Sequence, residues 1–277
     1  MVDIGKINTL RVRQVDLRGA WLGEGDNLVL LPRREAPPEV QEGDRLTVFI
    51  YHSSDATLAA TTRIPKAQVG EFARLKVNQT SKHGAFLDWG MEKDLLVPYS
   101  EQPERMREGR SYLVKVCLDD RQRPIGTALI DLCFAVDSVD VKAGQPVQLM
   151  VWRFTELGAA VIINHRYEGL LYRDEMGDNV RPGDRLSGYV RKVRADGKID
   201  VTLRPTGVAG IREGKDSLLT LLQEREFLPV HDRSTPETIQ RETGMSKKLF
   251  KKALGGLYKA GLVELVEDGV RLKKGKG

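Results

Sequence analysis

Residues 84–101 read GAFLDWGMEKDLLVPYSE, and versions of this stretch occur again at residues 19–35 and 158–175. The Gly-Ala pair that opens it recurs at offsets of 65 and 74 residues, and the glutamate that closes it recurs at offsets of 66 and 74. A later glycine, Gly109 in the middle copy, keeps offsets of 66 and 74 as well. Landmarks in one order at fixed offsets indicate a single supersecondary unit that is used three times.

The middle copy indicates what kind of unit this is. Apolar residues recur in short runs at residues 71–79, 85–89, 95–98, 112–118 and 125–132, with turn-forming residues between them. Such short alternating runs are typical of β-strands. Five strands in about 65 residues predict a small closed barrel of the OB type, whose ligand face lies on its second and third strands.

The last part of the chain has a different periodicity. We expect helices over residues 216–226, 236–244 and 247–259, the last of them capped by Ser246. Two apolar runs within residues 262–272 enclose an Asp-Gly turn, which predicts a β-hairpin. Helices followed by such a hairpin are typical of the winged-helix domain, a relative of the helix-turn-helix.

These patterns predict a mainly β protein with a C-terminal α+β domain, in which three tandem five-stranded OB barrels precede a winged helix. We expect the barrels at residues 1–66, 67–137 and 138–207, the first being the most divergent, and the winged helix at residues 208–277. A chain of 277 residues exceeds the size at which one core normally keeps growing, which agrees with several domains.

The basic character of the chain belongs to its C-terminal end. Residues 247–277 carry nine lysines and arginines and three acids, a net charge of +6, whereas the whole chain has +5. The third expected helix carries much of this charge. This helix carries lysines but no Asn, Gln or Arg that could read base edges. Its composition therefore favours contact with phosphates over recognition of bases. The candidate residues on this helix are Lys247, Lys248, Lys251 and Lys252. A protein-docking or capping domain with a solvated lysine face remains the alternative.

The sequence motifs of the repeats resemble those of the ribosomal S-one type of RNA-binding OB domain. The middle copy has GAFLDWG and LLVPYSE, the third has GAAVIIN, EGLLYRDE and DGKIDVTLR, and the first has the more divergent GAWLG and LVLLPRRE. The resemblance implies that aromatic side chains of each barrel stack on bases of single-stranded RNA while cationic side chains follow its backbone.

In the third copy Tyr172 takes the place of the family's histidine, and Lys198 that of the basic residue in its last strand. The side chains that lie near these two in the sequence and complete the candidate RNA site are Phe154, Arg173, Arg191 and Lys192. No copy keeps the full motif, because Ala160 replaces the motif's phenylalanine here. Lys198, in a hairpin turn, equally fits a solvated loop lysine.

In the second copy Phe86 matches the motif's phenylalanine, and His83 stands where an aromatic residue precedes the glycine. The first copy offers Trp21 at the phenylalanine position. Phe86 and Trp21 also fit side chains that fill a barrel core or pack one barrel on another. We therefore expect the copies to bind RNA in the order third, second, first.

Three S-one-like barrels followed by a winged helix resemble the conserved virulence factor B family of bacterial RNA-binding proteins. The segment FLPVHDRSTPETIQRETGMSKKLFKKALGGLYKAGLVEL is especially similar to that family's C-terminal domain. The resemblance implies a non-enzymatic cytoplasmic RNA-binding protein that regulates gene expression.

The alternatives are a DNA-binding winged-helix regulator with structural barrels, and a scaffold that binds ribosomal or nuclease proteins. We find no P-loop, dinucleotide-binding turn, metal-ligand cluster or catalytic triad, so we expect no enzyme, cofactor or metal. No apolar run approaches the ~18 residues of a membrane helix, and no signal-peptide pattern opens the chain. We therefore expect a cytoplasmic location and no membrane partner.

Overall fold

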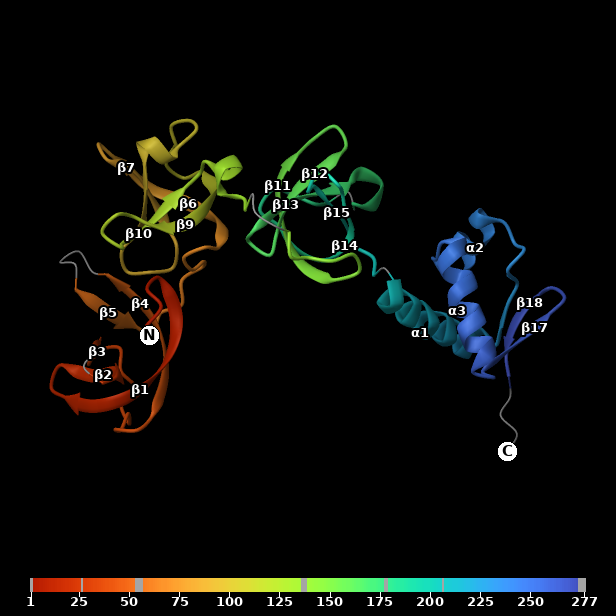
Figure 1. Ribbon diagram of the computed structural model, residues 1–277, viewed down its shortest axis with the longest axis horizontal. Helices are drawn as coiled ribbons and strands as arrows, with labels where there is room; N and C mark the ends of the chain where they lie inside the picture. Colours follow the sequence, from red (N-terminus) through yellow and green to blue (C-terminus); the bar gives the residue numbers. More distant parts are fainter. Residues whose placement is uncertain are drawn as a thin grey trace. The chain divides into compact units, whose positions relative to one another are not determined.

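The computed structural model is mainly β, with three five-stranded barrels or barrel-like sheets and a small C-terminal domain of helices and a three-stranded sheet (Figure 1). The predicted fold class is confirmed. The structure describes residues 2–25, 27–52, 57–135, 139–176, 179–205 and 207–273.

The chain forms two compact units. The first is Met1–Asp137 with His165–Tyr167, and the second is Ser138–Asn164 with Glu168–Gly277. The first unit holds two barrels, and the second holds most of the third barrel together with the C-terminal domain. The four predicted domain boundaries remain a prediction.

The first barrel is closed, with its strands in the order β1-β2-β3-β5-β4. Its elements are β1 (Lys6–Asp16), β2 (Gly19–Glu24), β3 (Asn27–Pro32), β4 (Arg45–His52) and β5 (Leu58–Thr61). Leu22, Leu31 and Ile50 fill the interior and are completely buried. These side chains come from three different strands and point to the inside of the closed sheet, where they form its apolar core.

The second barrel has the strand order β10-β9-β6-β7-β8. Its elements are β6 (Phe72–Ser81), β7 (Gly84–Asp88), β8 (Leu95–Pro98), the 3₁₀ turn η1 (Tyr99–Glu101), β9 (Ser111–Leu118) and β10 (Pro124–Thr127). The two edge strands β8 and β10 lie side by side. Gly126 allows this approach, since a Cβ there would stand 2.8 Å from Cγ2 of Val97.

The last strand of this barrel corrects the expectation of a strand over residues 125–132. β10 ends at Thr127, whose hydroxyl accepts a hydrogen bond from the backbone N–H of Leu129 at 3.2 Å. The chain then forms the 3₁₀ turn η2 (Ile130–Cys133). Apolar residues alone did not reveal this threonine turn, which competes with the ladder for backbone groups.

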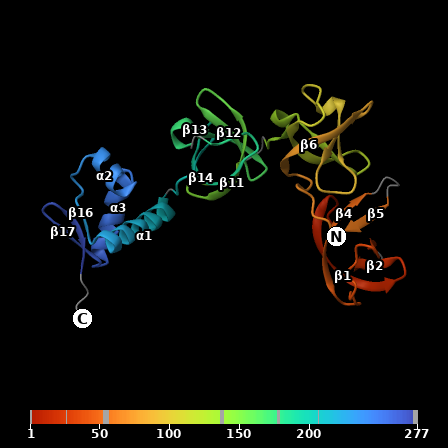
Figure 2. The ribbon, with the colours of Figure 1, turned by 180° about the vertical axis from the view of Figure 1, so that it is seen from behind.

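The third barrel is closed and repeats the order of the first, as β11-β12-β13-β15-β14. Its elements are β11 (Pro146–Phe154), β12 (Gly158–Ile163), β13 (Tyr167–Tyr172), η3 (Arg173–Glu175), β14 (Arg185–Val193) and β15 (Ile199–Thr202). Figure 2 gives a second view of these strands.

The repeated Gly-Ala pair has a structural cause. Gly19, Gly84 and Gly158 have φ angles of 145°, 151° and 154°. A Cβ at any of them would lie 2.0–2.2 Å from a carbonyl oxygen of the neighbouring third strand. Only glycine permits this close approach, so the landmark that identifies the repeat maintains strand pairing.

The first two barrels share a core within their unit. Phe49 of β4 is buried among side chains of the second barrel, and its ring meets Trp89 edge-on at 5.7 Å. Val69 donates its N–H to the carbonyl oxygen of Gly5 at 2.8 Å. Apolar burial with aromatic contact fixes one barrel on the other.

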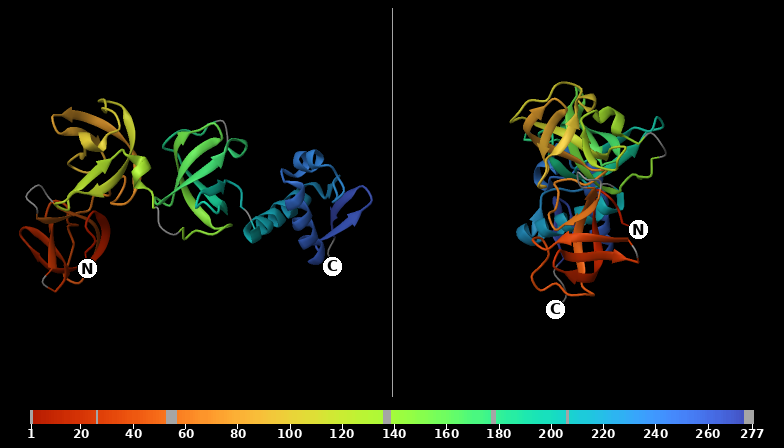
Figure 3. Two further views of the ribbon diagram at one scale, coloured as in Figure 1. Left: turned by 45° about the horizontal axis from the view of Figure 1, so that its top comes forward. Right: turned by 90° about the vertical axis from the view of Figure 1, so that its left-hand side faces the viewer.

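The C-terminal domain contains α1 (Gly207–Arg225), β16 (Phe227–Leu228), α2 (Pro236–Thr243), α3 (Lys247–Lys259), β17 (Val263–Val266) and β18 (Gly269–Leu272), seen from further directions in Figure 3. The predicted cap at Ser246 is confirmed, since its side chain accepts an N–H group of the first turn of α3. Thr235 caps α2 in the same way, and Gly244 ends α2 with φ of 69°. The hairpin is confirmed as well.

The first helix is longer than expected, because it begins at residue 207 and not at residue 216. Gly210 and Gly214 weaken the helical signal in its first half. Tertiary packing overrides that weakness, since Gly214 lies against Leu249 of α3, where a Cβ would be 3.0 Å from its Cδ1.

Candidate nucleic-acid interface

Tyr172 lies at the end of β13, half-buried, and belongs to a network of charged side chains. Its hydroxyl accepts a hydrogen bond from Nη2 of Arg194 at 2.6 Å. The same guanidinium donates to both carboxylate oxygens of Asp200, at 2.6 and 3.0 Å. The hydrogen bond with Asp200 raises the pKa of Arg194. Arg194 and Asp200 therefore hold the tyrosine in place, and sequence reasoning did not name either.

Arg191, one of the predicted RNA-binding residues, joins the same network. Its guanidinium lies 5.8 Å from the centre of the Tyr172 ring and donates to Glu175 at 2.9 Å. Each arginine of the network thus has an acidic partner. The cluster therefore holds the Tyr172 ring in position, and its arginines and acids balance in charge.

The other predicted residues of the third barrel are exposed. Arg173 lies in η3, Lys192 in β14, and Lys198 in the turn before β15, with 75% of its side chain exposed and Asp196 at 3.8 Å. Phe154, at the end of β11, is 50% exposed. Within the described residues, no hydrogen bond, ion pair or ring contact joins Phe154, Lys192 or Lys198 to Tyr172.

In the second barrel, His83 is exposed in the turn between β6 and β7, and Phe86 is half-buried on β7. A nearby aromatic residue was missed: Tyr99 donates its hydroxyl hydrogen to the carbonyl oxygen of Ser81 at 2.6 Å. The guanidinium of Arg105 stands 3.7 Å from the centre of the Tyr99 ring. The sequence feature that could have identified Tyr99 is its position directly after the proline of the repeat.

Arg105 also lines a hollow of about 530 Å³ in this barrel. Three further arginines line it, namely Arg74, Arg107 and Arg110. The run ERMREGR at residues 104–110 already showed the density of positive charge. Glu104 lines the hollow as well. Arginines beside an aromatic ring are side chains that can contact a base and its phosphates.

Trp21 of the first barrel is half-buried and held by two partners. Its indole N–H donates to Oδ2 of Asp16 at 3.0 Å, and the Arg18 guanidinium lies 4.8 Å from its ring. The hydrogen bond from Trp21, together with those from Arg18, lowers the pKa of Asp16 to about 2. One face of this indole is therefore covered by Arg18.

The lysines of α3 lie opposite its buried side. Phe250, Ala253, Leu254 and Leu257 face the core, while Lys248, Lys251, Lys252 and Lys259 are exposed. None of these four lysines forms a hydrogen bond or an ion pair with another described residue. Lys247 is half-buried, and its positive charge favours the ionised form of the Glu237 carboxylate. We call the four exposed lysines the lysine face.

Gly255 interrupts the lysine face. It is exposed in the middle of α3, and a Cβ there would meet nothing within 4 Å. A Cβ at its neighbour Gly256 would stand 1.8 Å from Cε of Lys215, so the end of that side chain would have to move. A mid-helix glycine that no packing requires leaves the surface open to close approach by a ligand.

The hairpin adds less free positive charge than its sequence suggests. Arg271 of β18 pairs with Glu264 across the hairpin. Lys273 follows the strand, whereas Lys274, which the sequence also places there, lies outside the described residues. The helix, more than the wing, therefore carries the unneutralised charge.

The described residues include no helix long and apolar enough to cross a membrane. They also include no group of three or more His, Cys, Asp or Glu side chains placed to hold a metal ion.

Two protein families match parts of the chain. The S1 domain matches residues 4–63 and 69–129, which are the first two barrels. The CvfB-like winged helix domain matches residues 216–272. The third barrel repeats the topology of the first. The protein is thus built from nucleic-acid-binding domain types, and these are not enzymatic families.

Curated relatives match nearly the whole length. Conserved virulence factor B of Staphylococcus epidermidis is 24% identical over 98% of this chain and 95% of its own. The predicted resemblance to the conserved virulence factor B family is confirmed. The uncharacterized protein YitL of Bacillus subtilis is 29% identical over 88% of this chain and 85% of its own.

Among solved structures, a multidomain protein with nucleic acid binding domains from Streptococcus pneumoniae is similar. It is 24% identical, covers 98% of both chains and gives a TM-score of 0.40.

Proposed function

We propose that this protein binds single-stranded or structured RNA with little sequence preference and regulates gene expression after transcription. The observation that carries the proposal is the lysine face of α3. Four exposed lysines without acidic partners gather on one helix that has no acid in its first turn. A polyanion is the partner that such a surface fits best.

The lysine face is unfavourable for the isolated domain. Lys248 and Lys252 are separated by one helical turn, as are Lys247 and Lys251, and like charges at this spacing repel. Lysines at the start of a helix also oppose its dipole. Phosphates placed along α3 would relieve both effects, so the arrangement supports binding to a nucleic-acid backbone.

RNA is favoured over duplex DNA by two features. The exposed side of α3 offers lysines and Gly255, and no Asn, Gln or Arg to read base edges. The barrels offer accessible rings at Phe154, His83 and Phe86, and rings are suited to unstacked bases. The relatives' name, conserved virulence factor B, supports a regulatory role for this chain.

The test is a competition between matched nucleic acids. Full-length protein is titrated with single-stranded RNA, hairpin RNA, single-stranded DNA and duplex DNA of one sequence over a range of salt concentrations. RNA is expected to bind most tightly, with a strong salt dependence. A preference for duplex DNA with a defined pair of half-sites would instead establish the DNA-binding alternative. Crosslinking in cells followed by sequencing identifies the bound class independently.

A further inference from the structure

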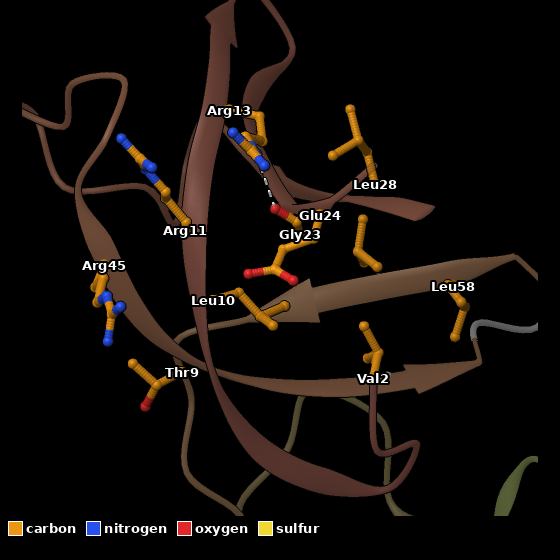
Figure 4. Close-up of a pocket in the computed structure, with 11 residues that line it drawn as sticks. Val2, Thr9, Leu10, Arg11, Arg13, Gly23, Glu24, Leu28, Arg45 and Leu58 are labelled. Carbon is orange, nitrogen blue, oxygen red and sulfur yellow. Dashed lines mark hydrogen bonds between the residues drawn. The ribbon is translucent and has the colours of Figure 1, made fainter. Parts of the chain in front are cut away.

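The first barrel contains a groove of about 720 Å³ that the S-one motif positions do not include. Figure 4 shows Arg11 of β1 and Arg45 of β4 on the left of the groove and Leu28 and Leu58 on the right, with Arg13 of β1 at the top. Leu58 is 38% exposed. The groove combines cationic side chains with an accessible apolar ledge.

The positive charge in this groove has little compensation. Arg13 donates to the carbonyl oxygen of Gly23 at 3.3 Å, and Arg11 and Arg45 form no ion pair within the described part of the chain. Glu24 also lines the groove without an ion pair to any described residue. Three arginines and one glutamate leave an excess of positive charge.

Two of these arginines stand directly opposite each other. Arg11 of β1 pairs with Arg45 of β4 in the antiparallel ladder. Opposed residues in such a ladder have Cβ atoms about 4.5–5.5 Å apart, and like charges there are destabilising. An anion bound beside these two strands would offset that repulsion.

The repeat supplies a comparison. The corresponding cross-strand pair is Lys76 with Ser111 in the second barrel and Met150 with Arg185 in the third. Only the first of the three barrels places two cations opposite each other. The arginine pair is therefore not a requirement of the barrel fold.

We infer that this groove binds the sugar-phosphate backbone of a short single-stranded RNA segment. Arg11, Arg13 and Arg45 each contact the phosphates of the segment, and Leu28 and Leu58 contact a ribose or base. Guanidinium groups suit phosphates because they donate two parallel hydrogen bonds. The inference rests on the proposed RNA binding and assigns to the divergent first barrel a role that its motif residues did not indicate.

The test compares two double variants of the full chain. Arg11→Gln/Arg45→Gln removes the opposed pair, and Arg121→Gln/Lys142→Gln removes two exposed cations elsewhere. Binding of a short oligouridylate is measured against salt. The groove variant is expected to lower the slope of log K against log salt by about 1.4, which is roughly 25-fold in affinity at about 0.1 M salt. The control variant is expected to change the slope little.

Folding provides the second measurement. Since the opposed arginines repel each other, the groove variant should melt at the same temperature as the natural protein or higher, so weak binding would not reflect unfolding. Sodium tripolyphosphate should raise the melting temperature of the natural protein more than that of the groove variant, which keeps the lysine face.

An unchanged salt slope in the groove variant, or an equal loss in the control, would overturn the inference. Lys248→Gln/Lys252→Gln is titrated in the same series. If the natural protein binds oligouridylate and only this lysine variant loses affinity, RNA binding stands and the groove falls. If the natural protein binds no RNA at any salt concentration, the proposed function itself fails.

Discussion

The cations of the third barrel and those of α3 are arranged in opposite ways. Arg191 and Arg194 each meet an acid, and together they hold Tyr172. The exposed lysines of α3 meet none among the described residues. Paired cations fix a side chain in place, whereas unpaired cations attract a distant polyanion. The charged side chains of the third barrel therefore position an aromatic ring, whereas the lysines of α3 are suited to attract phosphates.

The largest effect is expected from the lysines. Replacing Lys247, Lys248, Lys251 and Lys252 by Gln should reduce the salt slope of RNA binding by up to about 2.8, at roughly 0.7 for each lost single-strand phosphate contact. Filter binding over a salt series measures it. The Arg121→Gln/Lys142→Gln variant is the control for charge alone. An unchanged slope would assign α3 to packing or protein contact.

A smaller effect is expected in the third barrel. Tyr172→Ala with Lys198→Ala should weaken single-stranded RNA binding by about 1–3 kcal/mol, the contribution of one stacked base, with little change in the salt slope beyond that of one lysine. Isothermal titration measures both quantities.

Tyr172→Phe is the matched control, because it keeps the ring and removes only the hydroxyl that Arg194 contacts. If the ring stacks on a base, this variant should bind more tightly than the double alanine variant, and its loss relative to the natural protein measures the positioning by Arg194. Full affinity in the double alanine variant would remove the third barrel from the site.

The glycine pair of α3 separates close approach from packing. Gly255→Ala should stabilise the domain by about 0.5–1 kcal/mol, since alanine favours a helix and its Cβ meets nothing. If the RNA backbone passes close to α3, the added methyl group of Gly255→Ala should weaken RNA binding slightly. Gly256→Ala is the control, where the added Cβ displaces the end of the Lys215 side chain and the gain should be smaller. Chemical denaturation measures both, and unchanged RNA affinity in Gly255→Ala would contradict close approach.

The smallest effect concerns the first barrel and pH. The folded-state pKa of Asp16 is lowered to about 2, so its bonds to Trp21 and Arg18 contribute stability above the unfolded pKa of about 3.9. That contribution is lost as pH falls toward 2. Indole N–H chemical shifts of Trp21 in an acid titration should follow this change. In Asp16→Asn the transition should vanish, and its persistence would point to another group.

Much of the fold followed from the repeated stretch, and the reason is physical. At the position of Gly84 and its counterparts, only glycine fits against the neighbouring strand. Glycine therefore recurs there at fixed offsets. The cap at Ser246 was predicted from the sequence as well, because capping is a local interaction. The start of α1 and the end of β10 were mispredicted, since packing against Leu249 and the turn at Thr127 decided them.

The candidate site was predictable in its residue types but not in its partners. The sequence by itself determined three repeats, a basic C-terminal helix and the positions that match a nucleic-acid-binding motif, because each depends on order and spacing along the chain. Only the tertiary structure showed that Arg194 and Asp200 hold Tyr172, and that Arg11 stands opposite Arg45. Such contacts join residues from different strands, and strand register, which a linear pattern does not specify, decides which side chains meet.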